Sequence, residues 1–204
     1  MDSFYRHVVD ISVSKAVHYD SKLNMELYAM SGMSGFMTRC LYNNICSMKN
    51  VRYLEIGCFK GSTLCSAFYD NSGSFFGIDN FSEFGENKEE LLNNIAQFKT
   101  PDAHVQFIDV DCFQLDVNTL PHKFNVFLYD GNHTYESHFK ALTHYVHAMD
   151  DTFIFIVDDY NWAEVQNGTR NAIASTCEIL YEQELRTTNN DQYPNDDNMM
   201  KKTF

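Results

Sequence analysis

Residues 53–63 read YLEIGCFKGST, and this stretch decides the fold. An apolar run ends at Glu55, Gly57 follows two residues later, and Gly61 opens a segment that reads as a helix. A strand, a tight glycine turn and a helix start in this order bring backbone N–H groups and a helix N-terminus close to a bound ligand. The turn itself holds one glycine, unlike the Gly-x-Gly-x-x-Gly pattern with which dinucleotide-binding proteins approach a pyrophosphate.

Apolar runs of strand length alternate with segments of helical periodicity from residue 51 onward. Strands are predicted at residues 51–56, 74–79, 104–108, 124–129, 152–157 and 179–187, and helices at 62–69, 87–98, 134–149 and 165–177. Alternation of this kind predicts an α/β fold with a doubly wound, mostly parallel sheet. We therefore expect residues 49–187 to form a Rossmann-like core.

The two ends of the chain are expected to add to this core. Residues 1–20 show no clear period, whereas residues 21–48 read as two helical pieces hinged at the SGMSG stretch of residues 31–35. Residues 1–48 are therefore predicted to form a helical N-terminal cap. Residues 188–204 read as a polar loop with a short last strand at 200–204, so one domain is expected. Because that strand stops near the chain end, the chain is also compatible with a larger multidomain protein.

Five successive predicted strands each deliver a carboxylate at the carboxyl end. These acids are Glu55, Asp79, Asp109 with Asp111, Asp130, and Asp158 with Asp159. A single aspartate at a strand end often belongs to a turn. Five strands that bring acids to one rim indicate a functional site, because ligands of such sheets bind beyond the carboxyl ends of the strands.

The acidic composition narrows the choice of partners. The 204 residues include 15 lysines and arginines against 28 acids, a formal net charge of −13 that repels phosphate backbones, so no nucleic-acid partner is expected.

The six cysteines lack CxxC spacing and are predicted to be reduced thiols of a cytoplasmic protein. The start of the chain has no apolar segment of signal or membrane length, so no membrane association is expected. A homodimer is compatible with this composition.

Several segments resemble one enzyme family. The pattern Glu-x-Gly-x-x-x-Gly at residues 55–61 resembles the first nucleotide-binding motif of class I methyltransferases that depend on S-adenosylmethionine (SAM). The segment DGNHTYE at 130–136 is similar to the Asp-Gly-x-His-x-Tyr-Glu segment of a group that includes the macrocin-type sugar O-methyltransferases and their relatives. The segments VDDY at 157–160 and GTRNA at 168–172 resemble later parts of the same group. The resemblance covers roughly residues 30–175.

The resemblance implies a set of residues that bind SAM. The methionine portion is expected near the glycine turn and the following helix start, at Glu55, Gly57, Cys58, Gly61, Ser62 and Thr63. Asp79 and Asn80, at the end of the second strand, are expected to meet the ribose, as acids in this position do in nucleotide-binding folds. Asp111 and Cys112 are expected at the adenine, and Asp130 and His133 close to the cofactor.

The same resemblance implies a divalent cation, held by Asp130, Asp158 and Asp159. Carboxylate oxygens suit Mg²⁺, and a bound cation lowers the pKa of a hydroxyl group and orients it for attack on a methyl group. The alternative for the Asp158–Asp159 pair is a helix cap or a turn. His133 is open to three roles, as general base, as a contact of the SAM carboxylate, or as a helix cap, and Asp130 could be both ligand and base.

These expectations favour a SAM-dependent, Mg²⁺-assisted O-methyltransferase that acts on a sugar or glycan hydroxyl. The alternatives are a catechol-type or other small-molecule O-methyltransferase, and a non-catalytic SAM-binding module. Trp162, the only tryptophan, follows the acidic pair and is a candidate to stack on the acceptor sugar, with a packing role as the alternative.

Overall fold

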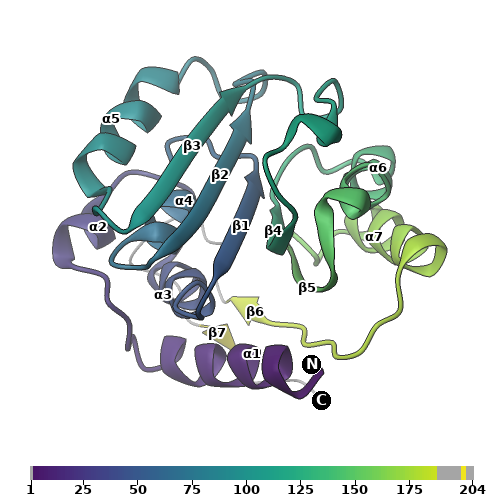
Figure 1. Cartoon of the computed structure of the whole chain (residues 1–204), viewed down its shortest axis with the longest axis horizontal. Helices are drawn as coiled ribbons and strands as arrows, with labels where there is room; N and C mark the ends of the chain where they lie inside the picture. The colour runs from purple at the N-terminus through teal and green to yellow at the C-terminus, as the bar shows by residue number, and fades with distance from the viewer. Residues whose placement is uncertain (1, 188–198, 201–204) are drawn as a thin grey trace.

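The computed structural model describes residues 2–187 and 199–200. Its centre is a sheet of five parallel strands in the order β3-β2-β1-β4-β5 (Figure 1). The strands are β1 (Val51–Ile56), β2 (Gly73–Asp79), β3 (Ala103–Asp109), β4 (Phe124–Tyr129) and β5 (Met149–Val157). The chain builds β1, β2 and β3 outward and then returns to place β4 on the other side of β1. This reversal puts a topological switch point between β1 and β4, where doubly wound sheets bind ligands.

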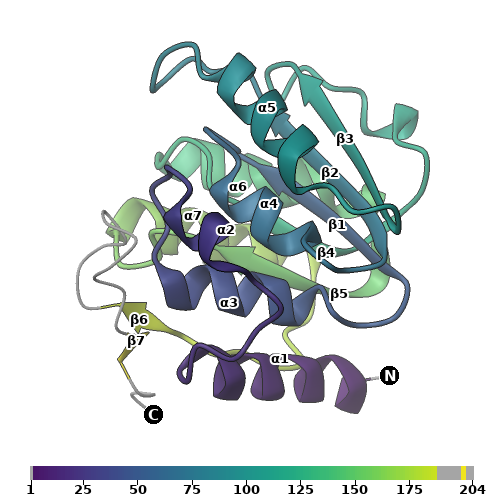
Figure 2. The same ribbon diagram turned by 90° about the vertical axis from the view of Figure 1, so that its left-hand side faces the viewer.

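Helices cover both faces of the sheet and bury its apolar side chains. One face carries α3 (Phe36–Ile45), α4 (Ser62–Phe68) and α5 (Lys88–Phe98), and the other carries α6 (Tyr135–Tyr145) and α7 (Ala163–Thr176) (Figures 1 and 2). Val126 and Leu128 of β4 belong to the first core, and Phe127 and Tyr129 to the second, because successive strand residues point to opposite faces. The expected α/β fold with a doubly wound parallel sheet is therefore confirmed.

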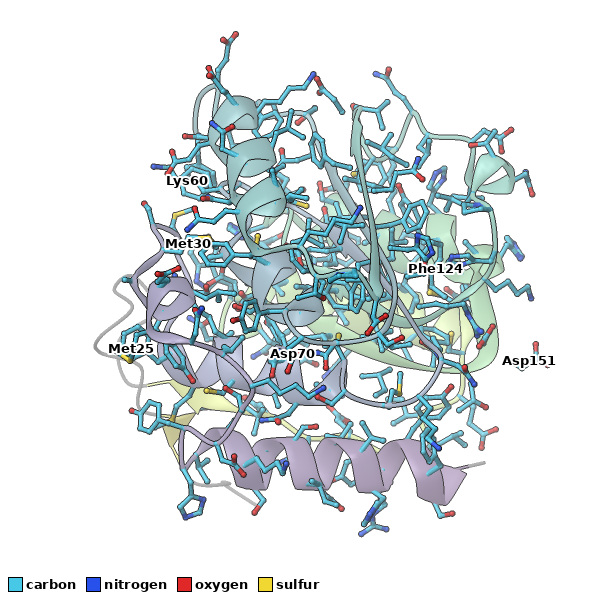
Figure 3. All side chains as sticks on the ribbon, turned by 60° about the vertical axis from the view of Figure 1, so that its left-hand side comes forward. Met25, Met30, Lys60, Asp70, Phe124 and Asp151 are labelled. Carbon is cyan, nitrogen blue, oxygen red and sulfur yellow. The ribbon has the colours of Figure 1, made fainter. Side chains whose placement is uncertain are left out.

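The N-terminal segment lies against the first of these faces. Helix α1 (Asp2–Ala16) packs on α3 and is followed by the short α2 (Met25–Ala29) (Figure 2). The loop after α2 reaches the glycine turn after β1, where Lys60 Nζ donates to Ser31 Oγ at 3.4 Å. Figure 3 shows Met30 and Lys60 on the same side of the molecule at this junction. Arg39 of α3 fixes the loop from within, since its buried guanidinium donates to the carbonyl oxygens of Leu27 and Met30.

The C-terminal part of the described chain departs from the sequence prediction. The strand expected at 179–187 does not join the main sheet; only β6 (Arg186–Thr187) is extended, and it pairs antiparallel with β7 (Met199–Met200). Ile179 and Leu180 are exposed, so this run buries no continuous apolar face. Residues 188–198 and 201–204, which hold the expected loop and most of the expected last strand, lie outside the described residues.

Two smaller differences concern the second half of the sheet. The helix expected over 134–149 ends at Tyr145, and the 3₁₀ turn Val146–Ala148 leads directly into β5 at Met149, earlier than the predicted 152. Another 3₁₀ turn, Val117–Thr119, precedes β4.

All six cysteines are free, and four of them are buried. None of the helices in the described residues has the length and apolar character needed to cross a membrane.

Candidate active site

A pocket of about 720 Å³ opens beyond the carboxyl ends of the strands. The loop after every strand of the main sheet contributes to its wall. The wall contains Gly57 and Phe59 after β1, residues 79–85 after β2, 110–113 after β3, 130–133 after β4, and Asp158, Asp159 and Trp162 after β5. Met33, from the loop before α3, also lines the pocket, as do Ile56, Ile78, Tyr129 and Ser137. The pocket therefore lies where the acidic rim was predicted.

The glycine turn after β1 is shaped by backbone contacts that exclude a side chain. Gly57 has φ of +89°, and a Cβ atom there would lie 1.8 Å from the carbonyl oxygen of Asp130. The backbone N–H of Gly57 donates to the carbonyl oxygen of Ile78 at 3.0 Å. Gly61, with φ of +85°, is the N-cap of α4. A residue without a Cβ is therefore required at Gly57, where the backbones of β1 and β4 meet.

Asp79 fastens this turn to the end of β2. Its Oδ2 accepts hydrogen bonds from the backbone N–H groups of Cys58 and Phe59, at 2.8 and 2.7 Å. Its Oδ1 accepts from the N–H of Phe81 at 2.7 Å. Asp79 also lines the pocket, so the carboxylate both orders the turn and faces the ligand space.

Glu55 lies under the turn and not on the pocket wall. The side chain is fully buried, and its two oxygens accept from the hydroxyls of Thr63 and Tyr53, each at 2.6 Å. Burial raises the pKa of Glu55 to about 7. The structure also places four other predicted cofactor residues behind the wall, namely Cys58, Gly61, Ser62 and Thr63. These five residues shape the turn from below.

The remaining predicted cofactor residues do line the pocket. Asn80 and Asp111 stand on the loops after the adjacent strands β2 and β3, and Asp111 Oδ1 accepts from the N–H of Phe113 at 2.9 Å. Cys112 lies beside them, and burial raises the pKa of its thiol to about 12. A thiol with such a pKa stays protonated near neutral pH, so Cys112 acts as a small apolar part of the wall.

Three polar side chains from β4 and β5 converge on the same pocket. Asp130, His133 and Asp159 bring one potential ligand atom each to within 4.8 Å of one another. His133 Nε2 lies 3.0 Å from Asp159 Oδ2, and this hydrogen bond raises the pKa of His133 against the opposing effect of burial. Asp159 has φ of +49°, an uncommon backbone conformation for a residue with a side chain. The Trp162 ring lies 5.0 Å from the His133 ring, centroid to centroid.

Asp158 stands beside this group without being one of its three members. It lines the pocket, and its Oδ1 accepts a hydrogen bond from the backbone N–H of Asp159 at 2.8 Å. Of the three predicted metal ligands, the structure therefore gathers Asp130 and Asp159, and His133 takes the third place.

The family model described as a methyltransferase domain matches residues 54–160, from β1 to the loop after β5. This match covers more than half of the chain. The chain belongs to this methyltransferase domain family. The matched segment contains the glycine turn, Asp79 and the Asp130–His133–Asp159 group. No curated protein matches this methyltransferase in sequence.

Solved structures resemble this methyltransferase in fold. The O-methyltransferase TomG of Streptomyces achromogenes, involved in tomaymycin synthesis and solved in complex with SAM, matches with a TM-score of 0.56 at 14% identity, over 86% of this chain and 83% of TomG. Precorrin-8w decarboxylase of Methanobacterium thermoautotrophicum matches with a TM-score of 0.55 at 13% identity, over 78% of each chain. A Thermoplasma acidophilum protein matches at 0.44 and 11% identity, over 62% of this chain and 51% of its own. The first two similarities establish the class I methyltransferase fold.

Several wall residues of this methyltransferase were not predicted from the sequence. They come from the loops after α2, β1, β2, β3 and β4, and they are Met33, Phe59, Phe81, Glu83, Phe84, Phe113 and Asn132. Glu83 Oε1 accepts a hydrogen bond from Asn132 Nδ2 at 2.7 Å, which joins the loop after β2 to the loop after β4. The sequence signal for these residues is the presence of aromatic side chains in polar loops that follow strand ends.

Proposed function

We propose that this methyltransferase transfers a methyl group from SAM to a hydroxyl oxygen of a sugar or glycan, with the help of a divalent cation. The observation that carries the proposal is that the Asp130–His133–Asp159 group shares one pocket with the glycine turn and Asp79. A nucleoside site and a group able to activate a hydroxyl therefore face the same space. TomG, of the same fold, was solved with SAM, which supports the choice of cofactor.

In this proposal SAM lies along the loops after β1, β2 and β3. Gly57 lets the turn pack directly against the backbone of Asp130, and the methionine end is proposed to lie in the pocket beside this junction. Asp79 Oδ2 already accepts two backbone hydrogen bonds, whereas Oδ1 accepts one and keeps a lone pair that can accept from a ribose hydroxyl. Asn80, Asp111 and Cys112 stand on the wall beyond it, in position for the ribose and the adenine. Glu55, Cys58, Gly61, Ser62 and Thr63 support the turn and act on SAM indirectly.

The group at β4 and β5 fits a divalent cation. Asp130 and Asp159 offer carboxylate oxygens, and Asp158 is a further candidate on the adjoining wall, while His133 keeps its nitrogen lone pair for a proton. Carboxylate oxygens suit Mg²⁺ and Mn²⁺, so these are the cations to test first. A cation bound here would lower the pKa of the acceptor hydroxyl and orient it.

The chain's own residues can also move the proton. When His133 is neutral and donates Nε2–H to Asp159, its Nδ1 carries the free lone pair and can accept the hydroxyl proton. The hydrogen bond to Asp159 fixes this tautomer and ring orientation, while Trp162 packs against the ring from the side. We propose His133 as the base, and Asp130 as the carboxylate that meets the acceptor.

A neutral acceptor fits the charge of the site. The pocket wall includes Glu83, Asp130, Asp158 and Asp159, and no lysine or arginine is among the described residues that line it. The formal net charge of the chain is −13. A polyanion such as RNA would be repelled both at long range and in the pocket. The resemblance to sugar O-methyltransferases at residues 130–136 and 157–160 favours a sugar hydroxyl among neutral acceptors.

A methyl-transfer screen tests the proposal. Tritium-labelled SAM is incubated with the full chain and with glycans, glycosides, catechols and RNA, in Mg²⁺, in Mn²⁺ and in EDTA. We expect label in a carbohydrate, loss of transfer in EDTA with SAM binding retained, and recovery when the cation is restored. Label in catechol or RNA alone would reject the sugar acceptor, and full transfer in EDTA would reject the cation. SAM binding with no transfer to any class would identify a non-catalytic binding module.

A further inference from the structure

The loop after β2 reaches across the pocket to the loop after β4. Glu83 Oε1 accepts a hydrogen bond from Asn132 Nδ2 at 2.7 Å, although the two residues are 49 positions apart. In the sheet, β1 lies between β2 and β4, so this bond spans the place where the glycine turn leaves β1. Both residues line the pocket. We call residues 80–87, which join β2 to α5, the strap.

The first residues of the strap are tied to the side chains that we assign to the ribose. Asp79 Oδ1 accepts from the N–H of Phe81 at 2.7 Å. Asn80 Oδ1 accepts from both the N–H and the hydroxyl of Ser82, at 3.2 and 2.8 Å. Short turns closed by a side-chain oxygen in this way are typical of aspartate and asparagine. Because Glu83 follows Ser82 directly, its place depends on Asp79 and Asn80.

The rest of the strap is held as well. The ring of Phe84 meets the ring of Phe59, in the glycine turn, edge to face with centroids 5.8 Å apart. Asn87 Nδ2 donates to the carbonyl oxygens of Phe84 and Gly85, at 2.9 and 3.0 Å. These contacts shape the strap between β2 and α5, and Glu83 connects it to the loop after β4.

Asn132 is fixed on its other side by the start of α6. Asn132 Oδ1 accepts from the N–H of Thr134 at 3.1 Å and from the hydroxyl of Ser137 at 3.2 Å. Thr134 is the N-cap of α6, and its side chain accepts from the N–H of Ser137. The carboxamide of Asn132 therefore stands between the strap and the helix. His133 lies between Asn132 and Thr134 in the sequence, so a shift of Asn132 would turn the backbone that carries the His133 ring.

We propose that Glu83 is a positioning residue, which acts through Asn132 to hold the loop that carries His133 while SAM is bound. This inference rests on the proposed function and deepens it, because it names a link between the cofactor side and the acceptor side of the pocket. SAM at Asp79 and Asn80 orders the strap, the strap holds Asn132, and Asn132 holds the backbone next to His133. The Glu83–Asn132 bond is exposed, so water competes with it and the link is loose until the cofactor orders the strap.

Exchange of the Thr134 N–H with solvent measures this link, because that N–H is bonded to Asn132 Oδ1. Exchange is followed by NMR in the full chain, with and without saturating S-adenosylhomocysteine, the product that SAM leaves after methyl transfer. We expect S-adenosylhomocysteine to slow exchange at Thr134 about threefold or more in the wild type. Glu83→Ala should abolish this slowing. Glu83→Gln loses the charge but keeps an oxygen that can accept from Asn132, so it should retain the slowing.

Calorimetry of S-adenosylhomocysteine binding gives a second measurement. Coupling between two sites is reciprocal, so Glu83→Ala should weaken binding by at most the factor by which the ligand slows exchange. Glu86→Ala is the matched control, because Glu86 is another exposed acid of the strap and lies outside the wall of this pocket. It should change neither the affinity nor the slowing. Exchange of the buried β4 amides shows that each variant is folded.

Asn132→Ala tests whether Glu83 acts through Asn132. Adding Glu83→Ala to this variant should weaken S-adenosylhomocysteine binding no further. Equal slowing at Thr134 in Glu83→Ala and the wild type, or loss of the slowing in Glu83→Gln, would overturn the inference. A wild type that binds S-adenosylhomocysteine without slowing at Thr134 would overturn it too. If calorimetry finds no binding at all, the proposed function fails as well, and that result is distinct from the others.

Discussion

The carbonyl oxygen of Asp130 occupies the space that a side chain on Gly57 would need. A Cβ atom on Gly57 would lie 1.8 Å from that oxygen and 2.5 Å from the carbonyl carbon. The two chain segments also share a hydrogen bond, from the backbone N–H of Asp130 to the carbonyl oxygen of Ile56 at 2.9 Å. The turn proposed to hold SAM and the carboxylate proposed to meet the acceptor are therefore parts of one rigid junction at the switch point of the sheet.

Gly57→Ala tests this junction. The positive φ costs an L-residue about 1–2 kcal/mol, and the clash with Asp130 adds to it because the new Cβ atom would meet a backbone carbonyl that follows directly on β4. We expect a loss of about 2 kcal/mol or more in the free energy of unfolding, measured in urea, together with loss of SAM binding by calorimetry.

Gly85→Ala is the matched control for that prediction. Gly85 has a similar φ of +82°, but a Cβ atom there would meet nothing within 4 Å. We expect this variant to lose only about 1 kcal/mol in the free energy of unfolding, the cost of the positive φ alone. If the two variants lost equal stability, the contact with Asp130 would not matter.

Asp79→Ala should damage both the turn and cofactor binding. The change removes the acceptor of three backbone N–H groups, those of Cys58, Phe59 and Phe81. We expect SAM affinity to fall by about 1.5–3 kcal/mol, measured by calorimetry, since a charged acceptor is lost. Asp109→Ala, at the register partner of Asp79 on β3, removes only an exposed pair with Lys88 and should change SAM affinity little. Equal effects would exclude a special role for Asp79.

The central strands β1 and β4 were predictable because they are buried on both faces and are therefore largely apolar. The structure places these strands at residues 51–56 and 124–129, the bounds predicted from the sequence. The acidic rim followed from the same reasoning, since parallel strands deliver their carboxyl ends to one edge. Asp79, Asp130 and Asp159 accordingly meet in one pocket.

Features that depend on tertiary contacts were not predictable. Helix α1 showed no period because Phe4 and Ile11 are exposed while Ser12 is buried against the fold. Glu55 was expected at the cofactor, yet the hydroxyls of Tyr53 and Thr63 hold it below the turn. Met33 and Phe84 also escaped prediction as wall residues, because loops distant in sequence meet at this pocket only once the sheet has formed.

Glu55→Gln should change how stability depends on pH. Burial raises the pKa of Glu55 from 4.5 to about 7, so the folded protein favours the protonated acid. The stability that the folded protein gains from holding Glu55 protonated is fully present below pH 4.5. It is lost as the pH rises toward 7, where ionisation of Glu55 costs about 3 kcal/mol. Glutamine does not titrate, so relative to Glu55→Gln the wild type should gain stability between pH 7.5 and pH 5.

Urea unfolding of both proteins at these two pH values measures the effect. The difference between them cancels the titration of every other group, including His138, whose pKa burial lowers to about 4. A difference that stayed constant with pH would mean that Glu55 has an ordinary pKa in the folded protein.

Asp159→Asn should weaken the proposed cation site. Asp159 contributes a carboxylate oxygen to the proposed cation site beside Asp130, so the change removes a charged ligand. We expect Mn²⁺ affinity, measured by electron paramagnetic resonance, to fall about tenfold or more. Asp151→Asn is the control, because Asp151 is exposed near the opposite end of β5, at the edge of the molecule in Figure 3. Equal Mn²⁺ binding in both variants would exclude Asp159 as a ligand of the cation.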